Sequence, residues 1–119
     1  ELGDALRSWC NPAGEDTSDP NIDLDILRAA VSGYARSAAG FLTAREIESI
    51  VPGVETVCVE LAARFCLDIF DDAYFGWDAN RFASRGEHNL LRAQGQVSLA
   101  RSVAAQRASV TAIVAKALI

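Results

Sequence analysis

Three aspartates, Asp68, Asp71 and Asp72, form the densest group of side chains in this sequence that could do chemistry. They fall where we predict the end of a long helix, next to the negative end of its dipole, so they need cationic partners nearby. One interpretation is a structural ion-pair network. The alternatives are a substrate site, since sugar hydroxyls and ammonium groups both bind carboxylates, and a metal site. The arginines available as partners are Arg7, Arg64, Arg81 and Arg92.

The only histidine, His88, stands beside Asn89 at the start of the last predicted helix. It either makes a capping or packing contact there or belongs to a site. The sequence has no Gly-rich phosphate loop, no nucleophile elbow and no HExxH motif. We therefore expect no complete active site in this chain, and we assign no catalytic residue and no metal ligand.

A dense aromatic group, Tyr74, Phe75 and Trp77, lies in a predicted loop. Aromatic side chains in a loop either cover the core or form the wall of a ligand site. Both interpretations are compatible with the sequence.

The three cysteines, Cys10, Cys58 and Cys66, form no CxxC pair of the kind that a metal or redox site uses. Cys58 and Cys66 are eight residues apart on one predicted helix. The helical rise alone separates them by roughly 12 Å, which is too far for a disulfide. We expect all three to be small core residues.

The charge pattern narrows the class of partner. The formal net charge is −5, and Lys116 is the only lysine among the 11 basic residues. No basic cluster is present to hold a phosphate backbone, so we expect no nucleic-acid partner.

No apolar run approaches the ~20 residues of a membrane span, and no signal-peptide pattern opens the chain. We expect a cytoplasmic protein without a membrane partner.

Composition favours an all-α fold. Half of the 119 residues are hydrophobic, alanine is common and only three prolines occur. We predict one helical unit over residues 1–119, a bundle of four to five helices. The chain contains no Met and opens with ELGDALR, which we interpret as the start of a piece of a longer protein.

The first half of the chain shows clear helix signals. Residues 3–9 are compatible with a helix, and Asp23 can cap a second helix that starts at Leu24. Apolar residues then recur at helical spacing and predict one buried face. This face consists of Leu27, Ala30, Val31, Tyr34, Ala38 and Phe41.

A capping box opens the next helix. Thr43 and Glu46 have the spacing at which each side chain satisfies a backbone amide near the other. We predict a short helix that ends near Val51, because Pro52 and Gly53 follow directly.

The second half contains two long helices and a loop. We predict a central helix over residues 54–71, buried on most sides, and a loop over residues 71–86. The last helix is expected to run from Glu87 nearly to the end of the chain. Gly95 interrupts it at a cost of about 1 kcal/mol relative to alanine.

Four segments, in the right order, resemble the aminoglycoside phosphotransferase-like kinases of the choline and sugar kinase superfamily, especially the sugar 1-kinase branch. The first segment, ELGDALRSWCNP, resembles the family's segment after the metal-binding aspartate. The last, HNLLRAQGQ, resembles the HNLxRA start of the family's final helix. The segments are ELGDALRSWCNP, LRAAVSGYARSAAGFLTAREIESIVPG, ELAARFCLDIFDDAYF and HNLLRAQGQ.

The resemblance implies that this chain is the helical, substrate-binding part of a protein-kinase-like C-lobe. The catalytic loop and the metal-binding aspartate would then precede Glu1, so ATP and Mg²⁺ would serve the full-length parent and the fragment alone would be inactive. The implied substrate contacts are Asp4, Arg7 and Arg92, with Tyr74 as a wall. The implied partners are a small hydroxyl-bearing substrate, such as a sugar or an aminoglycoside-like molecule, and the rest of the kinase chain.

A different class of function also fits the sequence. The chain could be a free-standing helical interaction module, in which the long final helix pairs with a partner or with itself. Apolar helix faces left exposed would then form a homodimer. The native reading frame distinguishes the two hypotheses, since an upstream HxD catalytic loop favours the kinase and a Met codon directly before Glu1 contradicts it.

Overall fold

The computed structural model describes residues 1–119 as five α-helices without a strand. This confirms the predicted all-α bundle of four to five helices. None of the five combines the length and the apolar composition that a membrane span requires. The helices are α1 (Leu2–Trp9), α2 (Leu24–Ala38), α3 (Ala44–Asp71), α4 (Arg85–Ala105) and α5 (Arg107–Leu118).

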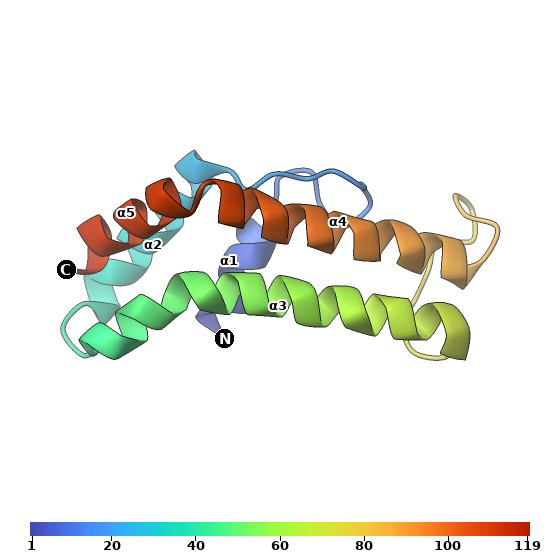
Figure 1. Ribbon diagram of the computed structural model, residues 1–119, viewed down its shortest axis with the longest axis horizontal. Helices are drawn as coiled ribbons and strands as arrows, with labels where there is room; N and C mark the ends of the chain where they lie inside the picture. The colour runs from blue at the N-terminus through green and yellow to red at the C-terminus, as the bar shows by residue number, and fades with distance from the viewer.

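The two long helices, α3 and α4, lie side by side and antiparallel in a molecule that measures 48 × 22 × 22 Å (Figure 1). The short α1 packs mainly on α3, and α2 and α5 pack on each other near the start of α3. All five helices contribute to one apolar core. Its members include Leu6, Leu27, Val54, Leu99 and Val110.

The starts of α2 and α3 follow the predicted capping chemistry. The Asp23 carboxylate accepts hydrogen bonds of 2.9 Å from two backbone N–H groups in the first turn of α2. Thr43 and Glu46 form the expected capping box at the start of α3. At α4, the Ser84 hydroxyl accepts from the backbone N–H of Glu87 at 3.1 Å, so this helix begins two residues before the predicted start.

The predicted helix boundary at Pro52 is wrong, because α3 continues unbroken from Ala44 to Asp71. Proline removes one helical hydrogen bond, but Pro52 is exposed, so water can take the place of the lost partner. The backbone of the next residue, Gly53, contacts α1, although a Cβ on Gly53 itself would meet no atom within 4 Å. A Cβ added to Gly3 would lie 2.8 Å from the carbonyl carbon of Gly53, so the two backbones touch here.

The predicted single C-terminal helix is two helices in the structure. Gln106, with φ −106° and ψ 19°, separates α4 from α5. Its side-chain amide donates to the Ser102 hydroxyl at 3.1 Å, which stabilises the bend. The bend directs α5 onto α2, where Val110 and Val114 are buried.

Four apolar positions predicted to be buried are exposed, and Val59 of α3 is one of them at 59%. Phe41 follows the end of α2 and is 69% exposed, while Phe70 on α3 is 85% exposed. Cys66 is exposed as well, whereas Cys10 and Cys58 are buried as predicted. The helix α3 is therefore not buried on most sides, because α1, α4 and α5 leave one of its faces uncovered.

Residues 11–22, which we name the strap, connect α1 to α2 and run along α4. The Ser98 hydroxyl donates to the carbonyl of Pro20 at 3.3 Å. The Ser102 hydroxyl, also on α4, accepts from the backbone N–H of Ile22 at 3.0 Å. A Cβ added to Gly95 would lie 2.3 Å from the carbonyl oxygen of Thr17. The glycine that interrupts the helix pattern is therefore required for the strap to pack on α4.

Candidate functional site

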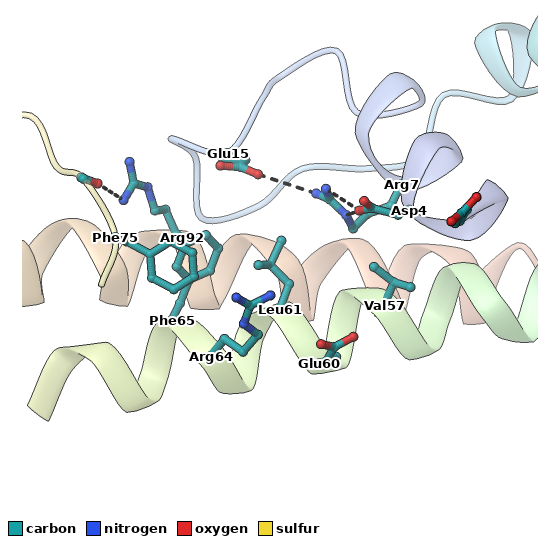
Figure 2. Close-up of a pocket in the computed structure, with 12 residues that line it drawn as sticks. Asp4, Arg7, Glu15, Val57, Glu60, Leu61, Arg64, Phe65, Phe75 and Arg92 are labelled. Carbon is teal, nitrogen blue, oxygen red and sulfur yellow. Dashed lines mark hydrogen bonds and ion pairs between the residues drawn. The ribbon is translucent and has the colours of Figure 1, made fainter. Parts of the chain in front are cut away.

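A pocket of about 620 Å³ opens beside α3, and α1, the strap, α4 and the loop over residues 72–84 complete its wall (Figure 2). Four carboxylates and three guanidinium groups line it, together with a small apolar floor. The lining residues are Glu1, Asp4, Arg7, Glu15, Val57, Glu60, Leu61, Arg64, Phe65, Phe75, Gly76 and Arg92.

Three of the four residues that the resemblance implies as substrate contacts line this pocket. Asp4 and Arg7 come from α1 and Arg92 comes from α4, so residues that are distant in the sequence line the two ends of one pocket (Figure 2). Tyr74 is not part of the lining. It is 72% exposed and packs edge to face on Phe75, with the two ring centres 4.9 Å apart.

Arg7 is almost fully buried and already paired. Its Nε and one terminal nitrogen both donate to Oδ1 of Asp4, at 2.9 and 2.8 Å. Its other terminal nitrogen lies 3.6 Å from a carboxylate oxygen of Glu15 on the strap. Arg7 therefore joins α1 to the strap, and two carboxylates balance its charge.

Arg92 lies at the opposite end of the pocket. Its terminal nitrogen donates to the carbonyl of Gly76 at 2.7 Å, which connects α4 to the 72–84 loop. The guanidinium also lies over the ring of Phe65, 5.6 Å from the ring centre. Its Nε is buried, has no hydrogen-bond partner and lies 3.9 Å from Oδ1 of Asp16.

Arg64 is a pocket residue that the sequence suggested only as a partner for the aspartate group. It is exposed and makes no hydrogen bond or ion pair. Its guanidinium lies 5.3 Å from the ring centre of Tyr74 and 5.7 Å from that of Phe75. Glu60, one turn before it, is also exposed and unpaired. The i, i+4 spacing of these two charges on α3 is the sequence signal that could have identified them.

The three aspartates do not form one cluster. Asp68 is buried and accepts hydrogen bonds from the backbone N–H groups of Ala73, Tyr74 and Phe75 and from the side chain of Asn89, all between 2.9 and 3.0 Å. Burial raises the pKa of this carboxyl, but these hydrogen bonds outweigh it and lower the pKa to about 2. Asp68 thus holds the start of the 72–84 loop against α4.

The other two aspartates have different surroundings. Asp72 pairs with Arg85 at 2.9 Å, whereas Asp71 is exposed and unpaired. None of the four arginines suggested as partners pairs with the group. The predicted ion-pair network is wrong in this respect, because backbone amides satisfy the buried member instead.

His88 is buried, and both of its ring nitrogens are occupied. Nδ1 accepts from the backbone N–H of Asp78 at 3.1 Å, and Nε2 lies 2.6 Å from Oδ1 of Asp16. The ring stacks on Phe82 with the centres 4.1 Å apart. Of the two interpretations from the sequence, these contacts agree with a packing contact. They leave no ring nitrogen of His88 free to act as a base.

The chemistry available at the pocket is recognition of a polar molecule. Free guanidinium and carboxylate groups can donate and accept hydrogen bonds, and the partly exposed Phe75 offers an apolar surface. No group of three or more His, Cys, Asp or Glu side chains is arranged to hold a metal ion. No model of a known protein family matches this sequence.

Proposed function

We propose that this chain forms the substrate-binding helical part of an ATP-dependent phosphotransferase that acts on a hydroxyl group of a small molecule. The observation that supports it is the meeting of Asp4, Arg7 and Arg92 at one pocket. The resemblance implies these residues from two segments that are far apart in the sequence.

The pocket suits a sugar or a similar polyol in size and chemistry. Its volume of about 620 Å³ lies within the range of small-molecule sites. Carboxylates accept hydrogen bonds from hydroxyl or ammonium groups, and the unpaired Arg64 and Glu60 supply one donor group and one acceptor group on the same side. Phe75, which is partly exposed, can cover the apolar face of a sugar ring.

ATP and Mg²⁺ do not fit the residues of this chain. It has no Gly-rich phosphate loop and no cluster of carboxylates arranged for a metal ion. We therefore assign the nucleotide and the metal to the rest of the proposed parent protein, and derive no catalytic step from the residues present.

The direct test uses the protein encoded by the natural reading frame of this sequence. We expect ATP turnover that rises when a sugar from a panel of glucose, glucosamine and kanamycin is added. We also expect an aspartate-containing catalytic loop and metal loop to be encoded before Glu1. A Met codon directly before Glu1, or ATP turnover that no compound of the panel changes, would count against the proposal.

Substitutions then test the pocket itself. Arg7→Ala and Arg92→Ala should raise the KM for the sugar, because each removes a connection in the pocket wall. Arg28→Ala is the matched control, since Arg28 is exposed on α2 and pairs only with Asp25. Equal KM values for all three variants, with circular dichroism confirming that they fold, would show that this pocket is not the substrate site.

A second candidate, an interaction or dimerisation module, is supported by the uncovered face of α3. Val59, Cys66 and Phe70 share this face at spacings of seven and four residues. Leu90 and Val97 continue it on α4 and are 48% and 38% exposed. Sedimentation at rising concentration tests this alternative: a dimer that Phe70→Glu abolishes supports it, and a monomer throughout the range excludes self-association.

A further inference from the structure

Asp16, on the strap, contacts three basic side chains from distant parts of the sequence. Oδ1 lies 2.6 Å from Nε2 of His88, and Oδ2 accepts from Arg81 at 3.0 Å. Oδ1 also lies 3.9 Å from Nε of Arg92, a pocket residue. The hydrogen bond from His88 is the largest influence on the pKa of Asp16 and lowers it. One exposed carboxylate thus joins the strap to α4 and to the 72–84 loop.

His88 completes this connection through its second ring nitrogen. The backbone N–H of Asp78 can only donate, so Nδ1 accepts and the ring hydrogen must sit on Nε2, where it points to Asp16. Phe82 covers one face of the ring. The imidazole therefore bonds to the strap on one side and to the 72–84 loop on the other, while its own backbone belongs to α4.

Both connected segments contribute residues to the pocket. Glu15, directly before Asp16, lines the pocket and lies near Arg7. Phe75 and Gly76 line it from the 72–84 loop, and Gly76 accepts a hydrogen bond from Arg92. Arg92 itself stands one helical turn after His88. The wall of the pocket near Arg92 is thus assembled from three segments that meet at these contacts (Figure 2).

We infer that Asp16 and His88 are positioning residues of the pocket, which hold the strap, the 72–84 loop and the Arg92 side chain in one arrangement. Neither residue lines the pocket, so each acts through the residues it connects. Without the Asp16 carboxylate, the buried Nε2–H of His88 loses its acceptor, and the only ion pair left between the end of the strap nearest the pocket and a helix is the 3.6 Å approach of Glu15 to Arg7. The remaining serine bonds hold the other end of the strap.

The inference is tested first without any ligand, so this part does not depend on the proposed function. Arg92 Nε is buried, so its hydrogen should exchange slowly with solvent in nitrogen-15 NMR spectra of the chain. Asp16→Ala should speed this exchange at least tenfold. Asp19→Ala is the matched control, because Asp19 lies on the same strap and its side chain contacts only Thr17. Equal exchange rates in the two variants would overturn the inference.

Two substitutions at His88 test its two hydrogen bonds separately. Each keeps one of the bonds, so that the variant retains part of the contact and can fold. His88→Gln places an amide donor near the position of Nε2 and should keep Arg92 protected while the Asp78 amide loses protection. His88→Asn places an acceptor near the position of Nδ1 and should give the reverse pattern. If both variants show the same pattern, His88 does not position the two segments separately and the inference is wrong.

The second part rests on the proposed function and uses glucosamine as the probe. Asp16→Ala should weaken glucosamine binding at least fivefold, measured by calorimetry, while Asp19→Ala leaves the Kd unchanged. Wild-type affinity in Asp16→Ala would refute the positioning role. Absence of binding to the wild-type chain would count against the proposed function instead, and the ligand-free exchange rates would still decide the inference.

Discussion

Replacing Gly95 with alanine is the sharpest test of how the strap packs on α4. The new Cβ would lie 2.3 Å from the carbonyl oxygen of Thr17, with the Pro20 side chain 3.8 Å away. An ordinary carbon to oxygen contact is about 3.3 Å, so the two groups must separate by about 1 Å. The oxygen belongs to the backbone and cannot rotate away, so the strap itself must move.

The expected cost follows from two opposing effects. Overpacking of this kind costs about 1–3 kcal/mol, and a lost strap hydrogen bond, such as the one from Ser98 to Pro20, adds about 1 kcal/mol. Alanine in a helix interior stabilises the helix by about 1 kcal/mol relative to glycine. We therefore expect Gly95→Ala to lower the free energy of unfolding by about 1–3 kcal/mol, and the Tm by about 4–12 °C for a domain of this size.

Urea and thermal unfolding, followed by circular dichroism at 222 nm, measure this difference. Gly53→Ala is the matched control, since Gly53 also lies inside a helix and a Cβ there would meet no atom within 4 Å. This variant should gain about 0.5–1 kcal/mol. If Gly95→Ala is as stable as Gly53→Ala, the strap does not approach α4 as closely as described, and the reasoning fails.

Three further predictions concern other parts of the fold. Gly3→Ala should also destabilise the protein by about 1–3 kcal/mol in urea unfolding, because its Cβ would meet the backbone of α3. Thr43→Ala should cost about 1 kcal/mol through loss of the capping box, and a smaller change than ~0.3 kcal/mol would contradict that role. The folded pKa of Asp68, about 2, lies below its usual value of 3.8, so its stabilising effect is complete above about pH 4 and is lost as the pH falls towards 2. Urea midpoints of wild type and Asp68→Asn should therefore converge across this range, whereas Asp71→Asn should follow the wild type.

The starts of α2 and α3 could be predicted from the sequence because capping is local. Asp23, Thr43 and Glu46 act on backbone groups within three residues of themselves, so their types and spacing are sufficient. The same reasoning failed at Pro52. There, the tertiary contact between α1 and Gly53, together with the length of α3, outweighs the local signal for a break.

The site was less accessible to sequence reasoning, because it depends on which helix faces meet. Helical spacing places Cys66 and Phe70 on an apolar face, but it cannot show that no other helix covers that face. For the same reason, Tyr74 lies outside the pocket although its neighbour Phe75 lines it. Asp16 carried no sequence signal at all, since its partners come from a loop and a helix more than 60 residues away.

The charged side chains at the pocket differ in whether they already have an ion-pair partner, and this decides which of them is free to bind a ligand. Arg7 is nearly buried, and two of its nitrogens donate to one oxygen of Asp4, so a ligand could bind Arg7 only by breaking this ion pair. Arg64 and Glu60 are exposed and unpaired, so they can bind a polar group without losing an existing partner. Under the proposed function, Asp4, Arg7 and Arg92 would therefore shape the pocket wall, while Arg64 and Glu60 of α3 would make the first direct contacts with a ligand.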